Sequence, residues 1–436
     1  MIISNLIGII ADDLTGANDT ALQFHLRGSN TQILLDYEAY LQNIKNAQTW
    51  AISTETRNVE PNIAYSKVKS ATKFFIDKLN LEFFYKKIDS TLRGNIAVET
   101  LAMLEVLKWD AAVIIPAFPS EGRITVGGYH LLKGTPIERT ELARDVHSPI
   151  FESNIPTLLR SQLDEGKKDL VGLIELSTIM KGAGPILFKI NELISKGKKL
   201  IVADSVSITD IEQVVLAINK SDYNILPTGS SACAQVLGNI WLPEMKNQHI
   251  QKTIPELPKL IISGSSTQTT ELQIKKLSNS DEFDNTYFIN LDLKTILNGV
   301  SEELINRVVH NLGQNNVVVV HTSYLIKDFD GFSDDCLNAG LTKTKLASMI
   351  TDFLAELTKT VVNKRDVILI TLGGETSYKC CSAIDSLQLQ LVDEVAPSIA
   401  LSIDHKAQWI VSKSGNLGTS NTLIDILNYF EKHEQN

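Results

Sequence analysis

The chain has 436 residues, of which 43% are hydrophobic and 21% are charged, and its formal net charge is −10. At about 150 residues per domain, this length predicts two or three domains with sizeable cores. The negative charge disfavours duplex nucleic acid as a partner, because phosphate binding needs concentrated Lys and Arg. Small anionic ligands remain open, since local positive charges can lie inside an acidic protein.

The sequence favours a cytoplasmic protein without a membrane partner. Its first apolar run meets Asp12 too early for a signal peptide, and no apolar stretch approaches the ~20 residues that a membrane helix needs. The four cysteines lack any CxxC spacing, so we expect buried thiols in a reducing compartment rather than disulfides or a zinc site. The oligomeric state is left open, a homodimer included.

The stretch from Leu6 to Asp19 carries the first candidate site. An apolar run over 6–11 ends in Asp12 and Asp13, and a helical pattern follows that Gly28 is placed to end. One aspartate is explained as a helix cap. Two of them, followed by Thr-Gly, indicate a ligand site beyond the carboxyl end of a strand.

Apolar runs alternate with amphipathic stretches along most of the chain. This alternation predicts parallel α/β sheets covered by helices on both faces. A proline-bearing stretch with weak periodicity interrupts it near residue 250. We therefore expect an N-terminal domain over 1–245, a linker over 246–258 and a C-terminal domain over 259–436. Expected strands are 6–11, 32–36, 50–53, 83–88, 111–115, 170–175, 200–203, 223–226, 259–263, 287–291, 316–321, 366–372 and 408–412, and expected helices include 65–79, 96–108, 185–195, 208–219, 271–277, 380–383 and 423–430.

Two further polar clusters follow predicted strands in the N-terminal half, at 54–57 and 86–95. Arg57 and Arg93 offer bidentate donors for a carboxylate, and Lys87 offers a point charge. Asp89 joins Asp12 and Asp13 as an acceptor for hydroxyl groups or a hydroxyl proton. Helix capping by Asp89, Ser90 or Thr91 is the simpler alternative, but it requires neither the lysines nor the arginine. The combination suits a small, hydroxylated, anionic ligand.

A loop rich in Pro and Gly follows at 116–130 and is expected to return as a hairpin. His130 and His147 lack a partner at metal-ligand spacing. Both are interpreted as structural, and no metal ligand is assigned.

Three strand–glycine–helix junctions lie in the C-terminal half, at 263–269, 373–376 and 413–420. Each offers backbone N–H groups at a helix N-terminus, which suits phosphate. None matches a Walker A or GxGxxG pattern. Three such loops, one carrying Lys413, indicate a nucleotide phosphate chain. A sugar-acid domain and a nucleotide domain with a cleft between them would suit phosphoryl transfer assisted by Mg²⁺.

These motifs resemble the four-carbon acid sugar kinase family, whose members include D-threonate, D-erythronate and 3-oxo-tetronate kinases. The resemblance spans essentially the whole chain. It is carried by Ala11-Asp12-Asp13-Leu14-Thr15-Gly16-Ala17, Lys87-Ile88-Asp89-Ser90-Thr91-Leu92-Arg93-Gly94-Asn95, Pro116-Ala117-Phe118-Pro119, Gly122-Arg123, Ser263-Gly264-Ser265, Gly373-Gly374-Glu375-Thr376 and Lys413-Ser414-Gly415-Asn416-Leu417-Gly418.

The resemblance implies an N-terminal domain that binds the sugar acid and a C-terminal domain that binds ATP. Asp13, Arg57 and the segment 87–90 would then contact the acid, and Ser265, Gly373, Gly374, Glu375, Thr376 and Gly415 would contact ATP, with Lys413 and Gly418 in the same loop. The chain departs from the family in three places. Glu375 replaces an Asp, Asn416-Leu417-Gly418 replaces Gly-Phe-Gly, and the segment Ala396-Pro397-Ser398-Ile399-Ala400 lacks an expected glycine.

The leading hypothesis is an ATP- and Mg²⁺-dependent kinase acting on the terminal hydroxyl of a four-carbon sugar acid. Arg57, Arg93 and Lys87 would hold the carboxylate and the transferring phosphate. Asp13, or alternatively Asp12, would orient or deprotonate the attacking hydroxyl. Two other readings are a non-catalytic sensor of sugar acid and nucleotide, and a nicotinamide-dependent oxidoreductase.

Overall fold

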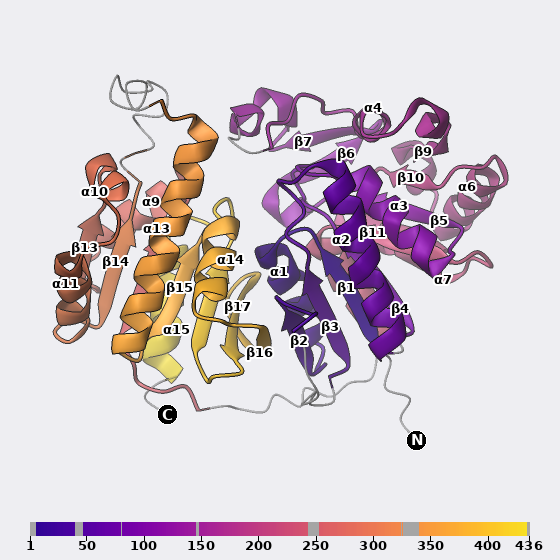
Figure 1. Ribbon diagram of the computed structural model, residues 1–436. Helices are drawn as coiled ribbons and strands as arrows, with labels where there is room; N and C mark the ends of the chain where they lie inside the picture. Colours follow the sequence, from indigo (N-terminus) through magenta and orange to yellow (C-terminus); the bar gives the residue numbers. More distant parts are fainter. Residues whose placement is uncertain are drawn as a thin grey trace. The chain divides into compact units, whose positions relative to one another are not determined.

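In the computed structural model, strands and helices alternate along most of the chain (Figure 1). The structure describes residues 6–39, 47–79, 81–144, 148–242, 253–323, 325 and 340–433. Its contacts divide these residues into two units, the first ending at residue 242 and the second comprising 34–39 and the residues from 253 onward. The predicted boundary near 250, most of the predicted linker and His147 lie outside the described residues.

The first unit contains a sheet with strand order β2-β3-β1-β4-β11-β5-β10-β9. β1 pairs in parallel with β3 and β4, and Ala11 lies opposite both Ser53 and Lys87. The chain segments that leave these three strands therefore emerge side by side. The strands are β1 (Ile7–Ala11), β2 (Thr31–Leu34), β3 (Thr49–Ser53), β4 (Phe83–Lys87), β5 (Ala111–Ile115), β9 (Val171–Ile174), β10 (Leu200–Ala203) and β11 (Ile225–Gly229).

Helices of the first unit pack in two groups. α2 packs on α3 and α3 on α4, whereas α1 packs on α8, α8 on α7 and α7 on α6. Strands β1, β3, β5 and β10 are buried along their whole length, as expected for a parallel sheet with both faces covered. The helices are α1 (Leu14–His25), α2 (Pro61–Phe74), α3 (Ile96–Leu107), α4 (Ile155–Ser161), α5 (Leu176–Ile179), α6 (Ala183–Ser195), α7 (Ile208–Asn219) and α8 (Ser231–Trp241).

A small antiparallel sheet holds the predicted hairpin. β6 (Arg123–Val126) pairs with β7 (Tyr129–Leu132), and β7 pairs with β8 (Thr135–Pro136). The buried carboxylate of Asp204 accepts hydrogen bonds from the backbone N–H groups of Gly127 and Gly128. This fixes the turn, and with it the position of His130 on β7.

The second unit contains strands in the order β13-β14-β12-β15-β18-β17-β16. The first five are parallel, and β17 and β16 complete the sheet as antiparallel strands. The elements are β12 (Lys259–Ser263), β13 (Thr286–Asn290), β14 (Val317–His321), β15 (Ile368–Leu372), β16 (Gln388–Ala396), β17 (Ile399–Asp404) and β18 (Trp409–Lys413), with α9 (Gln268–Ser278), α10 (Leu293–Asn298), α11 (Glu302–Leu312), α13 (Lys343–Lys364), α14 (Gly374–Ala383) and α15 (Thr422–His433).

The prediction of a two-domain α/β protein with mostly parallel sheets is confirmed, and several details differ. The helix predicted over 65–79 starts at Pro61 and ends in a π-helical turn over Phe75–Leu79. The strand predicted over 223–226 lies at Ile225–Gly229 and includes Pro227. Pro227 is tolerated in this strand because β11 pairs with β4 only from Thr228 onward, so β4 needs no N–H group from Pro227. β16 and β17 were not expected. Ser398, within the segment 396–400 where the resemblance implied a glycine, takes a positive φ of 63°.

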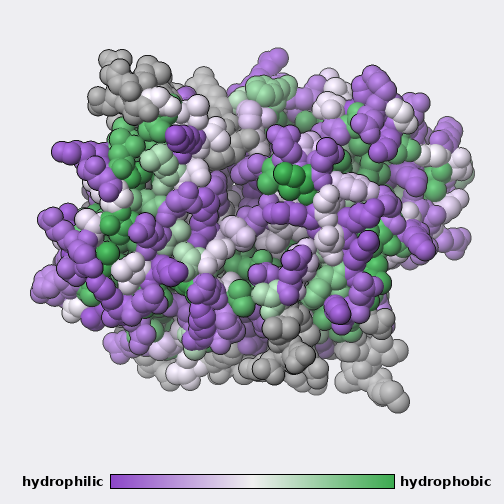
Figure 2. All heavy atoms as spheres, in the orientation of Figure 1, coloured by the Kyte–Doolittle hydropathy of each residue, from purple (hydrophilic) through white to green (hydrophobic). Residues whose placement is uncertain are grey.

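The surface agrees with the composition. Hydrophilic residues cover most of the face shown in Figure 2, where hydrophobic residues form separate patches. Among the described residues, no helix has the length and apolar character needed to cross a membrane. Cys233, Cys380 and Cys381 are buried thiols, and Cys336 lies outside the described residues.

Candidate active site

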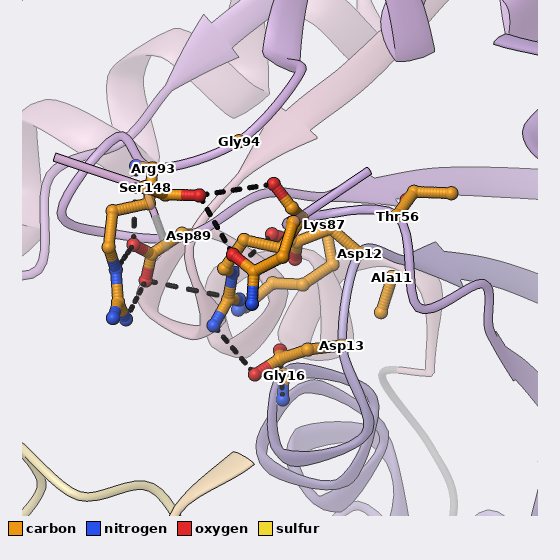
Figure 3. A network of polar contacts seen from close by, with 12 residues as sticks. Ala11, Asp12, Asp13, Gly16, Thr56, Lys87, Asp89, Arg93, Gly94 and Ser148 are labelled. Atoms are coloured by element: carbon orange, nitrogen blue, oxygen red, sulfur yellow. Dashed lines mark hydrogen bonds and ion pairs between the residues drawn. The ribbon is translucent and has the colours of Figure 1, made fainter. Parts of the chain in front are cut away.

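Arg57 joins the carboxylates that follow β1. Its Nε donates to Asp12 Oδ2 and its Nη1 donates to Asp13 Oδ2, each at 2.7 Å. The backbone N–H groups of Thr56 and Arg57 also donate to the carbonyl of Asp12. The loops that leave β1 and β3 are thus joined through both backbone and side chains (Figure 3).

Asp13 also begins helix α1. Its Oδ1 accepts from the backbone N–H of Gly16 at 2.8 Å, and its Oδ2 accepts from the Thr15 hydroxyl at 2.8 Å. The expected capping role is therefore present, but the same carboxylate binds Arg57. A Cβ at Gly16 would lie 2.6 Å from Asp13 Oδ1 and 2.8 Å from Lys87 Nζ, so only glycine fits beside both.

The loop after β4 supplies a second arginine–carboxylate pair. Arg93 Nε donates to Asp89 Oδ2 at 2.6 Å, and the Thr91 hydroxyl donates to the same oxygen at 2.5 Å. Asp89 Oδ1 lies 4.0 Å from Arg57 Nη2. Arg57 consequently stands among three aspartates, and the predicted residues after β1, β3 and β4 form one network (Figure 3).

Two lysines at the end of β4 have different partners. Lys87 Nζ lies 3.8 Å from Asp19 Oδ1 on α1. Lys86 is fully buried and forms a 2.7 Å ion pair with Glu99 on α3. Lys86 therefore supports the sheet, whereas Lys87 belongs to the network around Asp13.

The charges of the network set its protonation. Burial alone would raise the pKa of Asp13, but Arg57 and Lys87 outweigh it and hold that pKa below its usual value. For Asp89, Arg93 and Arg57 likewise overcome burial and keep the pKa well below normal. Both groups are therefore carboxylates at neutral pH, and they accept hydrogen bonds rather than donate them.

Glu55 and Asp19 behave in the opposite way, and neither was predicted as a site residue. Burial, followed by the charge of Asp13, raises the pKa of Glu55 to about 8. Burial raises the pKa of Asp19 to about 6 despite Lys87. Glu55 also has a positive φ of 47°, which non-glycine residues rarely adopt, and it accepts a 2.5 Å hydrogen bond from Ser53. A single glutamate two residues before Arg57 gave no sequence signal for this protonation.

His130 positions Ser90, the remaining predicted residue of the β4 loop. Its Nε2 donates to the Ser90 carbonyl at 2.8 Å, and its Nδ1 accepts from the Thr125 hydroxyl at 3.0 Å. Burial lowers the pKa of His130 to about 4, which agrees with a neutral ring. His130 is structural, as predicted, and the segment that it holds is the predicted binding loop.

In the second unit, the three predicted glycine loops meet at the carboxyl ends of β12, β15 and β18. Ser263 lies opposite Leu372, and Leu372 lies opposite Lys413. A Cβ at Gly415 would lie 2.5 Å from Ser265 Oγ, so these two loops pack closely. A Cβ at Gly373 would lie 3.5 Å from Ser265 Cβ. Ser265, Gly373 and Gly415 are therefore neighbours.

The other predicted residues of this cluster lie at the same edge. Gly374, Glu375 and Thr376 form the first turn of α14, and Glu375 Oε1 accepts from the Thr351 hydroxyl at 3.5 Å. Gly418 has a positive φ of 88°. Lys413 is fully buried, and its Nζ donates to the carbonyls of Ser414 and Leu417 at 2.7 and 3.1 Å. Direct binding of phosphate by Lys413 stays a prediction, and these contacts favour an indirect role.

No group of three His, Cys, Asp or Glu side chains in the described part of the chain is arranged to hold a metal ion.

The raised pKa of Glu55 predicts that Glu55→Gln changes the pH dependence of stability. The folded state retains a proton that the unfolded chain releases above its ordinary pKa of 4.5. Glu55 therefore lowers the free energy of unfolding as the pH rises towards 8. Urea denaturation should give similar stabilities for variant and wild type near pH 5 and a more stable variant near pH 8.5. The exposed Glu175→Gln serves as control, and a pH-independent difference for Glu55→Gln would contradict the assignment.

Two family models match most of the chain. Residues 7–237 match a family model described as a sugar-binding N-terminal domain, and residues 260–423 match one described as a nucleotide-binding C-terminal domain. Two crystal structures share the fold: Haemophilus influenzae protein HI1011 (TM-score 0.70, 23% identity, 97% of this chain and 100% of that one) and a Salmonella typhimurium protein (TM-score 0.76, 21% identity, 96% and 98%).

Named relatives are similar over almost their full length. The chain is 30% identical to a D-erythronate kinase of Heliobacterium modesticaldum, covering 98% of this chain and 97% of the relative. It is 26% identical to a D-threonate kinase of Salmonella typhimurium (97% and 98%) and 25% identical to a 3-oxo-tetronate kinase of Haemophilus influenzae (95% and 97%). The chain therefore belongs to the four-carbon acid sugar kinase family and is a phosphotransferase that acts on a sugar-acid hydroxyl.

Proposed function

We propose that the protein transfers the γ-phosphate of ATP to the terminal hydroxyl of a four-carbon sugar acid, namely threonate, erythronate or 3-oxo-tetronate. The observation that carries this proposal is the network of Arg57, Arg93 and Lys87 with Asp12, Asp13 and Asp89 at one sheet edge. It combines cations for a carboxylate with acceptors for hydroxyl groups. The names of the relatives, all kinases of such acids, support the choice of substrate.

The acid's carboxylate would bind to the cations of this network. Arg57 uses Nε and Nη1 for Asp12 and Asp13, which leaves Nη2 as its less occupied nitrogen. Arg93 and Lys87 are mostly buried; Arg93 pairs with Asp89, and Lys87 Nζ and Asp13 Oδ1 both lie next to Gly16. In the proposal, Arg93 and Lys87 share the negative charge of the acid and of the transferring phosphate, and Asp89 and Ser90 contact its hydroxyl groups.

Asp13 is the proposed residue that orients or deprotonates the attacking hydroxyl. Its carboxylate is ionised at neutral pH and fixed by Gly16, Thr15 and Arg57. A fixed carboxylate suits orientation, because phosphoryl transfer depends mainly on positioning and charge neutralisation. The Asp12 side chain accepts a hydrogen bond from Arg57 through Oδ2, while its Oδ1 is buried without a hydrogen-bond partner; in the proposal Asp12 serves to hold Arg57.

The glycine loops of the second unit are the proposed site for ATP. These loops bring small residues and backbone N–H groups together, which fits a phosphate chain. The residues are Ser265, Gly373, Gly374, Thr376, Gly415 and Gly418. Lys413 contributes by donating hydrogen bonds to the carbonyls of Ser414 and Leu417, which holds the backbone of this loop. Mg²⁺ would arrive with the nucleotide, since it is commonly held by one or two carboxylates together with substrate phosphates, whose charge it neutralises.

The substrate proposal is tested by measuring ADP formation from ATP and Mg²⁺ with D- and L-threonate, D- and L-erythronate and their 3-oxo forms. We expect turnover with one or a few members, because a hydrogen-bonding site discriminates the orientation of hydroxyl groups. Reactions without acid and with GTP are the controls. ATP binding without turnover on any member would contradict a four-carbon substrate.

The role of Asp13 is tested by Asp13→Asn, which keeps the side chain's size but removes its charge. We expect kcat to fall by roughly 10²- to 10⁴-fold, as is typical when a catalytic acid–base group is lost, with a changed pH profile. The exposed Asp425→Asn should behave as wild type. Full turnover with an unchanged pH dependence would show that Asp13 does not act on the hydroxyl.

A further inference from the structure

The loop over residues 414–419, which follows β18, has its carbonyl groups held by protein donors. From below, Lys413 Nζ donates to the carbonyls of Ser414, Gly415 and Leu417. Helix α9 and its N-cap supply further donors to these carbonyls. The carbonyl oxygens of Ser414, Gly415, Leu417 and Thr419 are therefore turned towards protein donors.

Three residues of α9 or its cap, spaced three apart, contact this loop. The hydroxyls of Thr267 and Thr270 donate to the Gly415 carbonyl at 2.8 and 3.0 Å. Gln273 Nε2 donates to the carbonyls of Leu417 and Thr419 at 3.1 and 2.8 Å. A spacing of three places side chains on one side of a helix, so α9 presents a row of donors to the loop.

The N–H groups of the loop are left for another partner. In the described part of the chain, the backbone N–H groups of Gly415, Asn416 and Gly418 make no hydrogen bond to another backbone or side chain. Successive backbone N–H groups can form a concave anion site, and Gly415 and Asn416 supply two such groups. Because the donors of Lys413 and α9 bind carbonyl groups of the loop, its unbonded N–H groups are the backbone groups that can bind an anion.

We propose that Gln273 is a positioning residue for nucleotide phosphates, which acts by fixing the carbonyls of Leu417 and Thr419 so that the N–H groups of Gly415, Asn416 and Gly418 face the phosphate chain. This role rests on the proposed function, since it requires ATP at this loop. Gln273 would not itself touch ATP.

The environment of Gln273 supports a specific role. Its neighbours Thr270, Ile274 and Leu277 are buried, and Gln273 is fully buried at a position where the helix pattern would accept an apolar residue. Its Oε1 has no hydrogen-bond partner. A buried amide oxygen without a partner costs stability. The residue is thus poorly explained by packing and well explained by its two donated hydrogen bonds.

The test compares Gln273→Leu with Gln408→Leu. Gln408 Nε2 also donates to two carbonyls of the second unit, those of Val367 and Trp409, but beside the amino end of β18. Each variant therefore loses two similar hydrogen bonds, and only Gln273 lies at the loop. Calorimetric titration with ATP, ADP and adenosine is combined with the KM values for ATP and for the accepted sugar acid.

We expect Gln273→Leu to weaken ATP and ADP about tenfold, as for two hydrogen bonds of ordinary strength. Adenosine affinity and the sugar-acid KM should be unchanged, and Gln408→Leu should match wild type. Equal nucleotide affinities in the two variants would overturn the inference, as would a parallel loss for ATP and adenosine.

Two further outcomes are distinguishable. Failure of the wild type to bind ATP would overturn the proposed function itself, and with it this role. If Gln273→Leu does not fold, Thr270→Val removes a donor to the Gly415 carbonyl with little change in shape. It should again weaken ATP but not adenosine, and an unchanged ATP affinity in Thr270→Val would overturn the inference.

Discussion

The ion pairs of Arg57 are the interaction on which the first unit's site depends. Asp12, Asp13 and Asp89 are all buried, and three buried carboxylates near one another would repel without a shared cation. Arg57 supplies that cation, and it helps to hold the pKa values of Asp13 and Asp89 below their usual value. Because its partners follow β1 and β4 while Arg57 follows β3, the same interaction fixes the relative positions of three loops.

The two units present candidate anion-binding groups of different kinds. In the first, cationic side chains are paired with carboxylates, so the proposed acid would meet a preformed arrangement of charges and acceptors. In the second, the candidate groups are backbone N–H groups, and the one lysine of the loop is buried beneath it. A compact carboxylate suits arginine forks, whereas an extended phosphate chain suits a row of backbone donors. This difference agrees with the proposed division of substrates.

Local sequence patterns predicted most of the parallel strands and the motifs at their ends, because burial and strand–helix alternation are local properties. They did not predict pairs that depend on the register of distant segments, such as Lys86 with Glu99 or Gln273 with Leu417. The direction of a side chain is also a tertiary property. Lys413 lies close to Gly415 and Gly418 in the sequence, yet its ammonium group is buried and donates to the carbonyls of the loop. The protonation of Glu55 likewise follows from burial beside Asp13, which no spacing reveals.

The central claim is that phosphate is placed on the terminal hydroxyl of a four-carbon acid. It is tested most directly by ³¹P–¹H correlation NMR of the product formed from ATP and the acid that supports turnover. The account predicts a single phosphoester whose phosphorus couples to the protons of the terminal CH₂ group. Coupling to a proton on an inner carbon, or inorganic phosphate with unchanged acid, would contradict it.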